Sequence, residues 1–180
     1  MRATFAIVLL GALALGVLPR HHSFAQDAAH GPASEGKRVF QRANCVGCHK
    51  WHGAGGGGYG GDALSLRATQ LDRDQIIETV TCGRPGTGMP YFQRGAYDSE
   101  AHPCYGMGRQ DLGKDVPVEA TTFLRPSEVG AVADYVVVEV KGKGEPTYAE
   151  CVAFFGEGSR VCNVYKSPTA EGAQAGKQGS

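Results

Sequence analysis

Cys45-Val46-Gly47-Cys48-His49 is the stretch of this 180-residue chain that decides its fold. Its two thiols stand three positions apart, and a histidine directly follows the second. Each thiol of such a pair can add across one vinyl group of a haem, and the adjacent imidazole then lies where it can bind the iron. A CxxC redox pair or half of a zinc site would contain the same thiols. The surrounding sequence favours one covalent haem c on Cys45 and Cys48, with His49 as an iron ligand.

The first 25 residues have the features of a secretory signal peptide. Arg2 gives a positive start, an apolar run extends from residue 3 to 18, and Ser23-Phe24-Ala25 fits a cleavage site of small residues. An uncleaved anchor is the alternative, but the run is shorter than the about twenty residues of a membrane span. No later segment is long and apolar enough to span. We expect cleavage near Ala25 and a periplasmic location, because bacteria attach c-type haem outside the cytoplasmic membrane.

Composition limits the possible partners. Cleavage at residue 25 would remove two of the 18 basic side chains and none of the 18 acidic ones, which gives 16 − 18 = −2. A nucleic-acid-binding protein would favour a strongly basic face, so nucleic acid is not an expected partner. The remaining 155 residues are enough for one domain.

Four cysteines lie outside the haem motif, and an even number in an exported chain indicates disulfides. Three pairings are possible. We favour the two that close short local loops, Cys82–Cys104 and Cys151–Cys162.

Three helices are predicted around the motif. The first spans about 34–43 and leads into it. The second begins after Asp72, a good N-cap with Gln75 at the capping-box position, and ends at Gly83. The third begins at Pro126, which suits a first helical position. Its apolar residues recur at helical spacing: Val129, Val132, Ala133, Val136 and Val140.

The order of these features resembles a class I c-type cytochrome over roughly residues 33–143, with one insertion. The resemblance implies an all-α fold, in which three to four helices surround a covalent haem. It also implies that the first and last helices cross, with Gly36 and Phe40 meeting Tyr135.

The resemblance suggests the second iron ligand as well. Met89, in Gly88-Met89-Pro90, matches the methionine–proline pair of the family, and its thioether would raise the reduction potential. Met107 is the rival, since sequence spacing alone does not separate the two. His102 is a weaker candidate, and His52 is too close to His49 to reach the opposite haem face.

The glycine-rich stretch 53–61 contains GxGxxG matches, but it neither follows a predicted strand nor opens a helix, which excludes a dinucleotide fingerprint. We expect a loop that passes close to the haem edge. In the family, a carbonyl of this loop accepts a hydrogen bond from the proximal histidine. Here Gly61-Asp62 replaces the usual Gly-Pro, which leaves the carbonyl unidentified. Four residues are candidates to hold the haem propionates: Trp51, Tyr59, Arg67 and Arg84.

The predicted organisation has four parts. A signal peptide (1–25) precedes a cytochrome c domain (26–143), whose insertion at about 91–124 forms an ordered loop held by Cys82–Cys104. A stapled extension (144–166) then forms a small hairpin or helical turn. The tail, 167–180, is rich in Ala, Gly, Gln, Lys and Ser and is predicted to be disordered.

Iron bound by histidine and methionine has no open position, which favours an electron carrier over an enzyme. A periplasmic dehydrogenase is the expected donor, and an oxidase or another cytochrome the expected acceptor, by analogy. After signal cleavage the chain is not expected to span a membrane. A tightly bound subunit of a larger oxidoreductase, such as a quinoprotein dehydrogenase, is the alternative. A haem enzyme or sensor with an open iron site is a third possibility.

Overall fold

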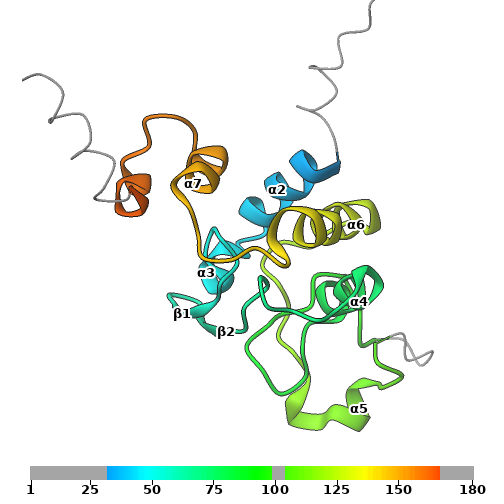
Figure 1. The fold of residues 1–180 in the computed structure, drawn as a ribbon. Coiled ribbons are helices and arrows are strands. Elements are labelled where there is room, and N and C mark those ends of the chain that lie inside the picture. Colours follow the sequence, from blue (N-terminus) through cyan, green and yellow to red (C-terminus); the bar gives the residue numbers. More distant parts are fainter. Residues whose placement is uncertain (1–31, 99–103, 167–180) are drawn as a thin grey trace, which may run out of the picture.

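A computed structural model gives the fold and describes residues 32–98 and 104–166. The predicted signal peptide, His102 and the predicted disordered tail lie outside these residues. Helices α2 and α6 pack against each other, and α4 lies next to α6. Helix α7 lies beyond α2, on the side away from α4 (Figure 1). The elements are α2 (Pro32–Arg42), α3 (Val46–His49), β1 (Gly56–Gly58), β2 (Gly61–Ala63), α4 (Arg73–Cys82), α5 (Arg109–Leu112), η1 (Gly113–Asp115), α6 (Pro126–Tyr135), η2 (Val136–Val140), α7 (Tyr148–Phe155) and η3 (Arg160–Tyr165).

Local sequence signals set the ends of α4 and the start of α6. The Asp72 carboxylate accepts a hydrogen bond from the Gln75 amide at 2.9 Å, and the Gln75 side chain accepts one from the Asp72 amide at 2.9 Å. Gly83 follows the last turn with φ 66°, a backbone angle that favours glycine. Pro126 is the first residue of α6. The run after Tyr135 stays helical but widens into the π-helix η2.

The crossing of α2 and α6 depends on Gly36. A Cβ placed on Gly36 would overlap the carbonyl oxygen of Ala131 and lie 2.5 Å from the Tyr135 Cβ. The rings of Phe40 and Tyr135 meet at the same crossing, with their centroids 5.5 Å apart. These three residues therefore meet as the family resemblance implied. The main hydrophobic core lies around this crossing, and Ile76 of α4 belongs to it.

The described residues include a small β-sheet, which an all-α fold does not have. Part of the glycine-rich stretch forms a two-stranded antiparallel hairpin, in which Gly56 pairs with Ala63 and Gly58 with Gly61. Glycine has low strand propensity, so the sequence pattern predicted a loop here. The hairpin packs against α3, and this tertiary contact accounts for a conformation that local propensity does not favour.

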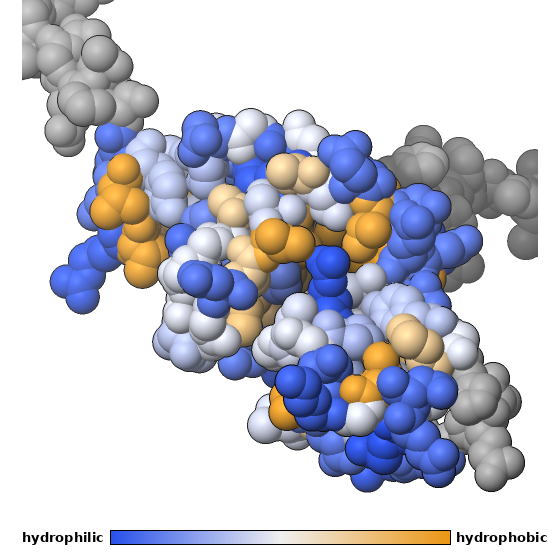
Figure 2. Space-filling view, turned by 90° about the horizontal axis from the view of Figure 1, so that it is seen from below, coloured by the Kyte–Doolittle hydropathy of each residue, from blue (hydrophilic) through white to orange (hydrophobic). Residues whose placement is uncertain are grey.

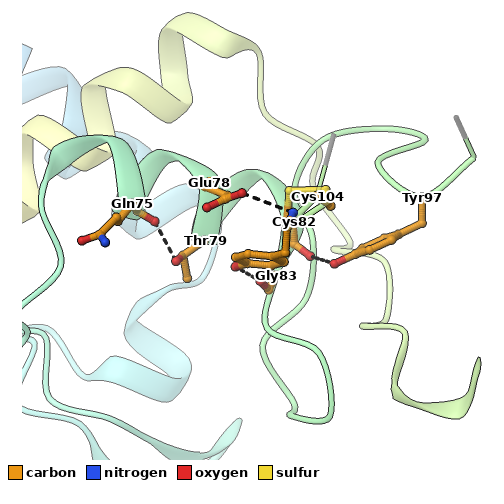
Figure 3. The surroundings of a disulfide bond; sticks show 8 residues. Gln75, Glu78, Thr79, Cys82, Gly83, Tyr97 and Cys104 are labelled. Carbon is orange, nitrogen blue, oxygen red and sulfur yellow. Dashed lines mark hydrogen bonds between the residues drawn. A yellow bond between two sulfur atoms is a disulfide. The ribbon is translucent and has the colours of Figure 1, made fainter. Parts of the chain in front are cut away.

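The insertion has a small core of its own at the end of α4. The Cys82–Cys104 disulfide is present, with a Cα–Cα distance of 5.5 Å, and it ties the insertion to the last residue of α4. Figure 3 shows Tyr97 aimed at this helix end, where its hydroxyl donates to the Cys82 carbonyl at 2.8 Å. The Tyr105 hydroxyl donates to the Gly83 carbonyl at 2.7 Å. Two carbonyls that α4 leaves unpaired are thus satisfied by tyrosines of the insertion.

The C-terminal extension consists of two short helices, α7 and η3, joined by the Cys151–Cys162 disulfide. Its aromatic side chains pack on the Trp51 ring, whose centroid lies 5.8 Å from Phe154 and 5.4 Å from Tyr165. Lys37 of α2 donates to the Ala153 carbonyl at 2.8 Å. The extension therefore contacts both α2 and the residues that follow the haem motif.

We expect the change of both Cys82 and Cys104 to serine to lower the free energy of unfolding by about 3 kcal/mol, since the bridge restricts the unfolded chain. The sequence separation of 22 residues exceeds the 11 of Cys151–Cys162, so the matched double change of Cys151 and Cys162 costs slightly less. Urea denaturation under non-reducing conditions measures both. A cross-linked peptide that joins the two pairs would contradict this pairing.

None of the helices in the described part of the chain is long and apolar enough to cross a bilayer.

Candidate functional site

The haem motif forms one short helix between two sharp turns. Cys45 is the N-cap of α3, and Cys48 and His49 end it. The flanking residues Asn44 and Lys50 both have positive φ, 60° and 61°, which turns the chain sharply at each end. Both thiols are outside the disulfides. The motif thus presents two unpaired thiols and an imidazole from a single turn.

A hydrogen bond fixes the His49 ring. Its Nδ1 lies 3.1 Å from the Leu64 carbonyl oxygen, just after strand β2. A carbonyl oxygen only accepts, so Nδ1 carries the proton and Nε2 keeps its lone pair. This tautomer is the one that a metal-bound histidine needs, with the second ring nitrogen donating to a carbonyl. Leu64 therefore provides the carbonyl that the sequence left unidentified.

Burial shapes the protonation of this motif. Burial lowers the pKa of His49 and outweighs the hydrogen bond to Leu64, while the charge of Arg84 lowers it further. Burial raises the pKa of the Cys45 thiol to about 12. A redox-active CxxC thiol has a lowered pKa and is a thiolate near neutral pH. The motif therefore offers a neutral imidazole and a protonated thiol, which does not fit a thiol–disulfide redox pair.

The glycine hairpin closes over one side of the motif. A Cβ on Gly60 would overlap the Cys48 sulfur, and a Cβ on Gly58 would lie 2.5 Å from the Gly47 carbonyl oxygen. The Tyr59 hydroxyl between them donates to the Asn44 side chain. Glycine is required at positions 58 and 60 because the backbone there comes too close to α3 for a side chain. The close neighbour of Gly58 and Gly60 is thus the motif itself, and the sequence prediction that this stretch passes the haem edge stays a prediction.

The residues present fit a covalent haem. Two free thiols, an imidazole in the ligating tautomer and a backbone acceptor behind it make up the donor set of that group. A zinc site would need further ligands nearby. Within residues 32–98 and 104–166, no group of three or more His, Cys, Asp or Glu side chains is arranged to hold a metal ion.

Met89 lies in a tightly hydrogen-bonded loop that follows α4. The Arg84 amide donates to the Met89 carbonyl at 3.2 Å, and the Met89 amide donates to the Thr87 hydroxyl oxygen at 3.2 Å. The insertion holds this loop at two points, because the Gly86 amide donates to the Asp115 carbonyl at 2.8 Å and the Gly83 carbonyl accepts a hydrogen bond from Tyr105. The Met89 side chain is partly buried.

Met107 has a different setting. Its amide donates to the Cys104 carbonyl at 2.9 Å in a turn of the insertion, three residues after the disulfide. Its side chain is also partly buried. Burial alone therefore does not separate the two methionines.

Two of the four candidates for holding propionates have other roles. All three nitrogens of the Arg67 guanidinium are bound within the protein, to Gly144, His52 and Glu150. Trp51 packs against aromatic residues of the C-terminal extension. Both residues connect the haem-motif region to the extension, a contact that no pattern in the sequence predicts. Arg84 is exposed, and the Tyr59 hydroxyl is bound to Asn44.

Comparison with known protein families agrees with this geometry. Residues 31–101 match the family described as cytochrome c oxidase, cbb3-type, subunit III. The match supports a c-type cytochrome domain in this part of the chain. The match includes the haem motif, the hairpin, α4 and Met89, and it ends before Met107. No curated protein and no solved structure matches the chain.

Sequence reasoning missed two parts of the site. The Leu64 carbonyl belongs to the main chain, so no residue type marks it. Glu150 could have been noticed, because Thr147 and Glu150 form the S/T-x-x-E pattern that begins a helix. Both capping bonds are present, from the Glu150 amide to the Thr147 hydroxyl oxygen at 3.2 Å and from the Thr147 amide to the Glu150 carboxylate at 2.8 Å.

Proposed function

We propose that this c-type cytochrome is a periplasmic, monohaem carrier of single electrons. The observation that carries the proposal is His49, whose ring is fixed by Leu64 beside two unpaired thiols. When bound, haem supplies a one-electron ferric/ferrous couple. Cys45 and Cys48 hold the group covalently, His49 donates through Nε2, and the Leu64 carbonyl orients the ring and raises its basicity.

Met89 is the proposed second ligand. The family match includes it and excludes Met107. The charge of Arg84, in the same loop, helps to lower the pKa of His49 after the larger effect of burial. The loop therefore lies within electrostatic reach of the proximal histidine. Its hydrogen bonds to the insertion restrict its motion, which lowers the entropy cost of holding a ligand in place.

The proposed partners are redox proteins in the same compartment. A periplasmic dehydrogenase would donate the electron, and an oxidase or another cytochrome would accept it. The interfaces of such redox complexes are small and their binding is weak. A surface that mixes hydrophobic and hydrophilic residues suits such binding. Figure 2 shows one face on which hydrophobic residues occur in small, separate groups among hydrophilic ones.

A second function is a tightly bound subunit of a larger oxidoreductase. The observation in its favour is the description of the matched family, which names a subunit of an oxidase. An obligate contact through the insertion would need a large apolar patch there. In the described part of the insertion, Val118 is the exposed large hydrophobic side chain. We therefore place the carrier first.

We expect the ferric protein to show the weak red-edge absorption band of methionine–iron ligation, and Met89→Ala to abolish it. The ferric iron becomes high-spin or binds water, and the reduction potential falls because the thioether favours ferrous iron. Absorption spectra of both oxidation states and a redox titration measure these changes. Met107→Ala, which removes the same side chain from the insertion, is the matched control and leaves the spectrum unchanged.

The opposite behaviour of these two variants would assign the ligand to Met107. An unchanged spectrum in both would remove the main support for a saturated iron and favour an open site. Size measurement of the purified protein at micromolar concentration, alone and with membrane extracts, separates a free carrier from a bound subunit.

A further inference from the structure

One buried arginine joins the C-terminal extension to the haem-motif region. Arg67 is 8% exposed. Its Nε donates to the Gly144 carbonyl at 2.6 Å, and its Nη1 donates to the His52 carbonyl at 3.0 Å. Its Nη2 lies 2.9 and 3.2 Å from the two carboxylate oxygens of Glu150. The residue after Trp51 and two residues of the extension therefore meet at a single side chain.

Contacts within the extension hold Glu150 in place independently of Arg67. It lies in the first turn of α7, where its carboxylate also accepts a hydrogen bond from the Thr147 amide. Partial burial raises the pKa of Glu150, but the hydrogen bonds from Thr147 and Arg67 together lower it, so the group is a carboxylate. The next residue, Cys151, is fully buried in the disulfide with Cys162. The anion is thus fixed by the fold of the extension.

The Arg67 backbone belongs to the segment that orients His49. The Leu66 amide donates to the Gly53 carbonyl at 2.7 Å, and the Arg67 amide contacts the same oxygen at 3.3 Å. Leu64, three residues before Arg67, accepts the His49 hydrogen bond. Gly142 donates to the Arg67 carbonyl at 2.9 Å. Residues 64–67 are therefore held between the haem-motif loop and Gly142, two residues before the extension begins.

We propose that Arg67 and Glu150 are positioning residues, through which the C-terminal extension sets the hydrogen bond from His49 Nδ1 to the Leu64 carbonyl and so tunes the reduction potential of the bound haem. The inference rests on the proposed role of His49 as the proximal ligand. A firm hydrogen bond at Nδ1 makes the imidazole more basic. A more basic ligand favours ferric iron, so loosening residues 64–67 raises the potential.

The sign of the change separates positioning from charge. If only charge matters, removal of the Glu150 carboxylate raises the potential and removal of the Arg67 cation lowers it, because ferric iron carries the extra positive charge. If positioning matters, both changes raise the potential, since each releases the same contact.

The test uses the holoprotein with three single changes, Glu150→Gln, Arg67→Gln and the control Glu157→Gln. Glu157 is exposed on the same extension, so its variant removes an equal charge outside the ion pair. Redox titration gives the potential. Proton NMR of the reduced protein gives the rate at which the His49 Nδ1 proton exchanges with solvent, which reports the Leu64 hydrogen bond directly.

We expect Glu150→Gln and Arg67→Gln to accelerate this exchange by about tenfold. We also expect both changes to shift the redox equilibrium toward the ferrous form by up to about tenfold. This is the lower end of the effect of removing a residue that supports a metal ligand through hydrogen bonds. A tenfold shift is about 59 mV for a one-electron couple. Glu157→Gln leaves both quantities near the wild-type values.

Opposite shifts of potential in the Glu150 and Arg67 variants, with unchanged exchange, would overturn the proposal in favour of charge alone. Lower thermal stability without a change in either quantity would also overturn it, because the pair is then only structural. If Arg67→Gln does not fold, Glu150→Gln alone tests the proposal. Its exchange rate at His49 Nδ1 reports the hydrogen bond to Leu64, and the loss of a charge by itself does not change that rate. A wild-type spectrum without histidine ligation would instead refute the proposed function.

Discussion

We expect haem to be lost from the chain in denaturing electrophoresis when both Cys45 and Cys48 are changed to alanine. This is the largest effect we expect on function, because the two thiols at the start and end of α3 are the proposed sites of the thioether bonds. Each single change should leave one thioether and a haem that still migrates with the protein. Haem staining of a denaturing gel and the mass of the purified chain measure the outcome.

The matched control is the double change of Cys151 and Cys162 to alanine, which also removes two thiols. That variant loses the bridge of the extension but keeps covalent haem. Haem that remains attached to the Cys45/Cys48 double variant would refute the attachment site. Loss of haem from both double variants would mean that the extension is needed for attachment, which the geometry of α3 does not require.

Gly36→Ala should lower the free energy of unfolding strongly, although it adds only one methyl group. Alanine normally stabilises a helix by about 1 kcal/mol relative to glycine. Here the added methyl group overlaps the Ala131 carbonyl oxygen, which belongs to the backbone of α6 and cannot move alone. The two helices have to separate, so we expect a net loss of about 2–3 kcal/mol, the upper part of the about 1–3 kcal/mol typical of overpacked cores.

Gly130→Ala is the control on the partner helix. A Cβ there meets only the flexible end of Arg73, at 3.5 Å. It should gain up to about 1 kcal/mol from helix propensity. Denaturant unfolding of both variants measures the difference. Equal effects of the two substitutions would show that the crossing tolerates a larger distance than the structure indicates.

Much of the fold could be predicted because its signals are local or belong to a known pattern. Asp72, Gln75 and Gly83 specify the ends of α4 within twelve residues, and Pro126 specifies the start of α6. The two short-loop disulfides follow from the positions of the cysteines. The crossing at Gly36 came from the family resemblance, since nothing local to Gly36 indicates that Ala131 lies against it.

The remaining features depend on contacts that local sequence does not encode. The glycine hairpin exists because α3 packs against it, and glycine itself carries no strand signal. The Leu64 carbonyl is a main-chain atom, and any residue type could supply it. The Arg67–Glu150 pair joins positions 83 residues apart, and the many charged residues of the chain offer no way to choose that pair from sequence. The identity of the second iron ligand stays a prediction.

The position of the extension along the chain has a consequence for the order of folding. Its contacts span long stretches, 83 residues between Arg67 and Glu150 and 116 between Lys37 and Ala153. Contacts of large sequence separation cost the most closure entropy and tend to form late. Residues 144–166 are also the last of the described residues to be synthesised. Trp51 and Arg67 thus stay uncovered until residues 144–166 dock, and we expect the side of the haem motif that they border to close late among the described residues.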